Sequence, residues 1–68
     1  MKIRYDPDAD AVYIKLSDEK VETTREVDDD TILDYDKRGR LIGIELLFVK
    51  ERMPHLLKEI QVENLIAA

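Results

Sequence analysis

Apolar and polar residues alternate along the first two thirds of the chain, and this alternation predicts β-strands. A period of two places every second side chain on the same face of a sheet. The segments that show it are 2–5, 11–16, 21–27, 31–35 and 41–46. The residues expected on the buried face are Ile3, Tyr5, Val12, Ile14, Leu16, Val27, Leu33, Tyr35, Ile42, Ile44 and Leu46.

The last two segments form the clearest hairpin. Asp36–Gly39 connects them as a tight turn, because an Asp side chain bonds the backbone two residues on and Gly adopts positive φ. Gly43 interrupts the second strand of this hairpin. A glycine in mid-strand indicates a bulge, or the close approach of a backbone or of a ring such as Tyr13.

Segment 21–27 is apolar only at its ends and carries charges between them. Charged side chains discourage further strand pairing, so this segment is expected at an edge of the sheet. Tyr13 and Ile32 fall on the outer face of their strands, opposite the expected core.

The periodicity changes after the fifth segment. Pro54 suits the first turn of a helix, where its missing N–H has no intrahelical partner. Leu56, Leu57 and Ile60 follow at helical spacing, so a helix is predicted from the proline to Ile60. The last eight residues continue this helix or form an extended arm, and their periodicity does not decide between the two.

These elements predict the α+β class. A curled antiparallel sheet of about five strands, in meander order, is expected over residues 1–48. Residues 49–68 are expected to supply a C-terminal helix on one face of the sheet, followed by an arm. The whole chain, residues 1–68, is short enough to form a single domain, and a domain of this size buries only about 60% of its unfolded surface.

Charge and composition narrow the classes of partner. The formal net charge of −5 argues against nucleic acid, whose phosphates would be repelled. No apolar run approaches the ~18 residues of a membrane span, so no membrane contact is expected. The chain has no Cys, which excludes disulfides and thiolate zinc sites and fits a cytoplasmic location.

Two motifs resemble a known family. They read YDPDADAVYIKL over residues 5–16 and LDYD…GRLIGIEL within residues 33–46. The match spans about residues 3–48 and resembles the family called "domain of unknown function 2283". That resemblance implies a small bacterial or archaeal β-rich module without an assigned activity. Some members of the family lie beside small toxin-like genes, which implies an antitoxin-like role.

Asp6, Asp8 and Asp10 are the candidates for a metal site, because alternate carboxylates open calcium-binding loops. Such a loop requires Gly at its sixth position and Glu at its twelfth, where this chain has Ala11 and Ser17. The pattern therefore favours a turn whose Asp side chains bond backbone amides. No metal or other cofactor is expected.

No set of residues indicates an enzyme, so no catalytic or cofactor-binding residue is assigned. His55 is the only histidine, has no nucleophile near it in sequence, and is expected at the surface. Lys37, Arg38 and Arg40 form a basic hairpin tip, which is typical of a solvated surface.

The apolar residues that the predicted helix leaves uncovered indicate an interface. A seven-residue helix covers only part of one face, and a large exposed apolar patch is unusual on a soluble monomer. We therefore expect a homodimer in which the C-terminal segment makes contact, through Phe48, Val49, Leu57, Val62, Leu65 and Ile66. Three functions remain open: an interaction module with a small basic protein partner, antitoxin-like in its specific form; a self-assembling structural dimer; or a metal-dependent activity.

Overall fold

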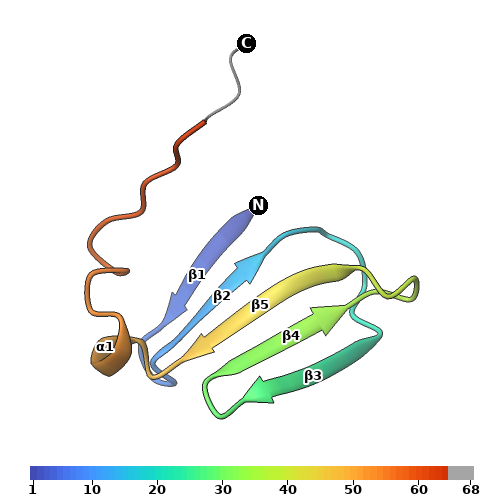
Figure 1. The fold of residues 1–68 in the computed structure, drawn as a ribbon, viewed down its shortest axis with the longest axis horizontal. Coiled ribbons are helices and arrows are strands. Elements are labelled where there is room, and N and C mark those ends of the chain that lie inside the picture. The colour runs from blue at the N-terminus through green and yellow to red at the C-terminus, as the bar shows by residue number, and fades with distance from the viewer. Residues whose placement is uncertain (65–68) are drawn as a thin grey trace.

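One antiparallel sheet of five strands forms the body of the protein in the computed structural model, which describes residues 1–64 (Figure 1). A four-residue helix, α1 (Val49–Arg52), follows the last strand. The sheet is curled and not closed, so the predicted α+β class with five antiparallel strands is confirmed. The strands are β1 (Lys2–Asp6), β2 (Ala11–Lys15), β3 (Thr23–Asp28), β4 (Thr31–Tyr35) and β5 (Leu41–Leu47).

The predicted meander order is wrong. The strand order is β1-β2-β5-β4-β3, so the last strand lies in the centre between two hairpins. The connection over residues 16–22 runs along one end of the sheet from β2 to β3 at the far edge (Figure 1). It crosses three interstrand spacings, about 14 Å, and seven extended residues reach further than that.

This order follows from the side chains of the strands. β5 carries the densest set of aliphatic residues and gains most from a central position, where neighbours lie on both sides. β3 is exposed along its whole length and lies at an edge, as the charges of segment 21–27 predict.

The helix predicted from Pro54 to Ile60 is also wrong. α1 ends at Arg52, before the proline, and residues 54–58 form turns. The residue that precedes a proline is disfavoured in the α region, and Met53 accordingly has φ −141°. Four residues of helix and a run of turns replace the expected element.

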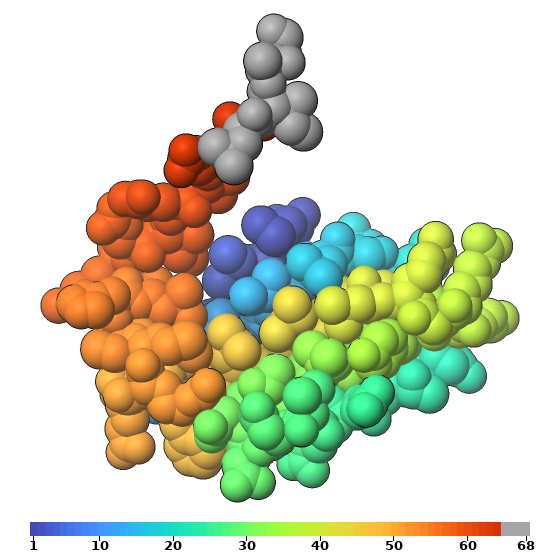
Figure 2. Space-filling model, viewed as in Figure 1, coloured from blue at the N-terminus to red at the C-terminus, as the bar shows by residue number. Residues whose placement is uncertain are grey.

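The segment after α1 does not pack on the sheet. α1 lies at one end of the sheet, and residues 53–64 extend beyond β1 without crossing the strands in a view down the shortest axis (Figures 1 and 2). Within residues 1–64, therefore, no helix covers either face. The radius of gyration is 13.4 Å, whereas a compact domain of this length has about 11 Å.

The enclosed core is correspondingly small. Its apolar members are Ala11, Val12, Ile42 and Val49. No helix among the described residues is long and apolar enough to cross a membrane.

Candidate interaction surface

The strand register assembles the apolar residues into a continuous row across four strands. Ile3 pairs with Ile14, Ile14 with Ile44, and Ile44 with Leu33. Directly paired residues project from the same face of a sheet, so these four side chains form one surface, the central row. The row beside it contains Tyr5, Val12 and Leu46. We call the side of the sheet that carries these rows the apolar face.

The middle of the apolar face has no cover among residues 1–64. Val12 and Ile42 are 1% and 3% exposed, but Ile3 is 38% exposed. Ile14 and Ile44 are only half-buried although Ile44 lies in the central strand, β5, and Ile14 lies in β2 beside it. A stable domain buries the apolar side of a sheet against a second layer, and the described residues supply no such layer.

The opposite face is polar and is organised around Tyr13. The ring lies over Gly43, where a Cβ atom would come 2.6 Å from the Tyr13 Cζ. The close approach of a ring at Gly43 is therefore confirmed. A bulge lies beside it as well, because the register shifts between Asp34, which pairs with Gly43, and Tyr35, which pairs with Leu41. The Tyr13 hydroxyl donates to Asp34 at 2.7 Å, and Thr24 Oγ1 donates to the same carboxylate at 2.7 Å.

Electrostatics favours the neutral phenol in this network. The pKa of Tyr13 is raised to about 12. Burial is the largest cause, followed by the hydrogen bond to Asp34 and by the negative charges of Asp34 and Glu45. The hydroxyl therefore remains a donor at neutral pH. The network fixes the orientation of these three side chains on the polar face.

Two acidic turns hold α1 at one end of the sheet. In the β1–β2 turn, the Asp10 carbonyl accepts from the Val49 N–H at 3.3 Å and its carboxylate accepts from the Lys50 N–H at 3.2 Å. In the β3–β4 turn, Asp30 lies 3.4 Å from Arg52 Nε. Both turns and α1 lie at the same end of the sheet (Figure 1). Helix α1 thus connects turns that are far apart in sequence.

Two of the three carboxylates proposed for a metal, those of Asp6 and Asp10, accept hydrogen bonds in or beside the first turn. Asp6 Oδ1 accepts from the backbone N–H groups of Asp8 and Ala9, at 3.0 and 3.3 Å. Asp10 Oδ1 accepts from the Tyr5 hydroxyl at 2.8 Å. Across residues 1–64, no group of three or more His, Cys, Asp or Glu side chains is arranged to hold a metal ion. These contacts support the interpretation of the segment as a turn.

We expect calcium to bind with a dissociation constant weaker than about 100 µM, because sensor loops that bind in or below this range have converging ligands. Calorimetric titration of the full chain with calcium, magnesium and manganese measures this. The variant Asp8→Asn is the matched control, and a tight, saturable isotherm that this variant abolishes would contradict the prediction.

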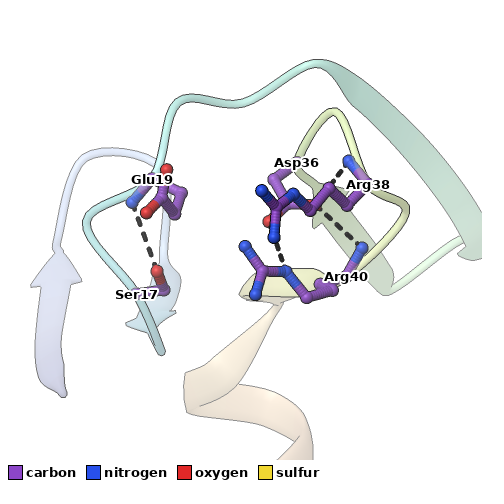
Figure 3. A network of polar contacts seen from close by, with 5 residues as sticks. All are labelled: Ser17, Glu19, Asp36, Arg38 and Arg40. Carbon is purple, nitrogen blue, oxygen red and sulfur yellow. Dashed lines mark hydrogen bonds and ion pairs between the residues drawn. The ribbon is translucent and has the colours of Figure 1, made fainter.

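The opposite end of the sheet carries the hairpin tip, which is built around Asp36 (Figure 3). Asp36 is 6% exposed, and its Oδ1 accepts from the backbone N–H groups of Arg38 and Arg40, each at 2.9 Å. Arg40 Nε donates to Oδ2 at 2.9 Å. Gly39 has φ 77°, as the turn requires. The predicted Asp36–Gly39 turn is therefore confirmed.

The basic residues of the tip do not form a strongly positive pocket. A shallow cleft beside the tip is also lined by Glu19, Glu22 and Asp36. Four basic side chains lie beside three acidic ones there, so the cleft is only weakly positive.

Asp36 gives the fold a pH dependence. Backbone hydrogen bonding from Arg40 is the main cause that lowers the pKa of Asp36 below its usual 3.8. A lowered folded-state pKa contributes stability above the unfolded value and loses it as the pH falls through the folded value. We expect Asp36→Ala to lower the thermal midpoint by several degrees at pH 7, and the difference from the parent to shrink below pH 4.

Thermal melts monitored by circular dichroism from pH 2 to pH 7 measure this effect. The control is Asp29→Ala, an exposed Asp in the β3–β4 turn, for which we expect little change. A deficit of Asp36→Ala that stays constant down to pH 2 would contradict the assignment to the carboxylate.

The predicted interface residues fall in different environments. Phe48 adopts the left-handed conformation at φ 56°, and its side chain is 49% exposed. Val49 is fully buried within the chain and is therefore not available to a partner. Leu57 and Val62 are 40% and 84% exposed. Leu65 and Ile66 lie outside the described residues. His55 is exposed, as expected.

Sequence reasoning assigned the central row to the core and not to an interface. The assignment depended on the helix that was expected to cover it. The short length of that helix did indicate an interface, but the residues named for it lie in the C-terminal segment.

Comparison with known proteins identifies the family. None of the curated proteins and none of the solved structures compared with the chain matches it. The family model described as "Protein of unknown function (DUF2283)" matches residues 2–50, which include all five strands and the start of α1. The resemblance inferred from the two motifs is thereby confirmed, and the chain belongs to the DUF2283 family.

Proposed function

We propose that the domain is a protein–protein interaction module that docks another polypeptide on its apolar face. The observation that carries this proposal is the central row, whose four aliphatic side chains have no covering layer among residues 1–64. Covering ~800 Å² of apolar surface contributes about 20 kcal/mol before the cost of association. That gain is large compared with the few kcal/mol that stabilise so small a domain.

The chemistry of the two faces supports binding over catalysis. The apolar face offers aliphatic groups, and the polar groups of the other face bond to one another through Tyr13, Asp34 and Thr24. Within residues 1–64, neither face combines a deep cleft with a nucleophile and a base, which covalent catalysis needs.

A photo-activated amino acid placed on each face tests the proposal in the cell of origin. Position 3 reports on the apolar face and position 4 on the polar face, because successive residues of β1 point to opposite sides. We expect one dominant protein adduct from position 3 and none from position 4, with the adduct lost when Ile14→Lys is added. Equal adducts from both positions, or none from either, would overturn the proposal.

A small basic protein is a second candidate partner, and an antitoxin-like role is its specific form. The observation that favours it is the acidic end of the sheet, where the two turns together carry six Asp residues (Figure 1). Electrostatic steering acts over about one Debye length, ~8 Å at physiological salt.

If such a partner exists, we expect its association rate to fall as the salt concentration rises. Stopped-flow measurement with the purified pair records this, and the variant Asp8→Asn/Asp29→Asn should weaken the salt dependence. An association rate that does not change between low and high salt would count against electrostatic recruitment.

A further inference from the structure

We infer that the occupant of the apolar face is a second copy of this chain, packed face to face so that the acidic end of each sheet lies over the hairpin tip of the other. This inference rests on the proposed function, because it names the partner for the same face. It goes beyond that proposal because it states that a second copy of the chain covers the face and that no different protein is required. Three features of the chain carry it.

The first feature is the excess surface. The chain exposes 5707 Å², whereas a folded monomer of about 8 kDa exposes roughly 4,450 Å². The difference, about 1,250 Å², comes from the uncovered face and the extended segment after α1. A standard interface buries about 800 Å² on each partner. The excess, which the apolar face shares with the exposed segment after α1, is larger than the area that one partner of such an interface buries.

The second feature is the self-complementarity of the central row. Two sheets that pack face to face lie about 10 Å apart, with aliphatic side chains interdigitating between them. A two-fold axis through the row places Ile and Leu side chains against Ile and Leu side chains. The row meets a charged residue only at the edge strand, where Leu33 pairs with Arg25. A two-fold pair therefore buries no unpaired charge at its centre.

The third feature is the separation of charge along the strands. The end with α1 carries seven acidic and two basic residues, from the two turns and the helix. The other end carries six basic and four acidic residues. The basic residues at that end are Lys2, Lys15, Lys20, Lys37, Arg38 and Arg40, and the acidic ones are Asp18, Glu19, Glu22 and Asp36.

Charge selects between the two limiting orientations of such a pair. A two-fold axis parallel to the strands would bring the two acidic ends together, and their like charges would repel. An axis perpendicular to the strands, in the plane between the sheets, places each acidic end, with a net charge of −5 (two basic minus seven acidic residues), over the end with a net charge of +2 (six basic minus four acidic residues). The second orientation is the one that we infer.

Analytical ultracentrifugation of the purified full chain at micromolar concentration tests the identity of the occupant. We expect twice the chain mass of 8.0 kDa. The variants Ile14→Lys and Ile3→Lys place a cation in the central row and should weaken self-association at least ~100-fold, because an unpaired charge would be buried at the centre of the interface.

The matched control is Ile32→Lys, which lies on the polar face between Glu26 and Glu45 and should leave the dimer intact. Circular dichroism confirms that each variant folds. A folded parent protein that sediments at the monomer mass overturns the inference. The inference is also overturned if the Ile14→Lys and Ile3→Lys variants both fold and both remain dimeric.

A spin label tests the orientation. The chain has no Cys, so Lys37→Cys attaches one label at each hairpin tip. Opposed tips should be separated by at least the length of β5, seven residues or about 23 Å. Adjacent tips, at less than about 15 Å, would overturn the inferred orientation.

The outcomes of the two proposals are separable. A monomeric purified chain together with a crosslink from position 3 to a different protein overturns the second-copy inference and supports the interaction module. A monomer without any crosslink from position 3 overturns both.

Discussion

Gly43→Ala should destabilise the fold by about 3–4 kcal/mol, enough to leave much of a domain of this size unfolded. The added Cβ atom would lie 2.6 Å from Tyr13 Cζ, in the middle of the central strand, so the ring must move. Once displaced, the Tyr13 hydroxyl no longer reaches Asp34. Overpacking and a lost hydrogen bond therefore act together, and urea denaturation measures their sum.

Two controls isolate the steric cause. Gly39→Ala meets no atom within 4 Å but retains φ 77°, so it should cost only about 1 kcal/mol, from backbone strain. Tyr13→Ala in the Gly43→Ala background removes the clash, so the double variant should lose less stability than the sum of the single variants. Strict additivity of the two substitutions would contradict this explanation.

Val49→Ala should cost about 2 kcal/mol, because it removes two methyl groups from a fully buried site. Val49 is the only buried residue of α1, and its N–H donates to the Asp10 carbonyl. The loss should therefore also loosen the contact between α1 and the first turn. Chemical denaturation gives the free energy, and amide hydrogen exchange at Lys50 reports the local effect.

Val27→Ala is the matched control, since Val27 is 54% exposed on the edge strand β3. Its loss should stay within about 0.5 kcal/mol. Equal losses at the two valines would mean that α1 is not anchored by its buried side chain.

The positions of the strands could be predicted because a period of two is a local property of the sequence. The Asp36–Gly39 turn and the approach of a ring to Gly43 could also be predicted from the local sequence, because each depends on a distinctive residue type. The strand order was not accessible. The chain between β2 and β3 is long enough either to turn back at once or to cross the end of the sheet, and only the packing of β5 distinguishes the two.

The helix prediction failed because it weighed the side-chain spacing of Leu56, Leu57 and Ile60 above the backbone effect of Pro54. A short helix forms only when packing of its apolar side offsets the free-energy cost of nucleation, and within residues 1–64 that side has no surface to pack against. The acidic end of the sheet was also hidden from the sequence. Asp6–Asp10 and Asp28–Asp30 appear as separate clusters, and the register of five strands brings them to the same end.

The central position of the last strand has a consequence for synthesis on the ribosome. The hairpins β1–β2 and β3–β4 can each form within microseconds, but a two-stranded hairpin is marginal in water. Each pairs with β5 along a strand edge that stays open until residue 47 has left the exit tunnel. The nascent chain therefore gains its stability in one late step, and until then its open edges are substrates for chaperones or for mispairing with neighbouring chains.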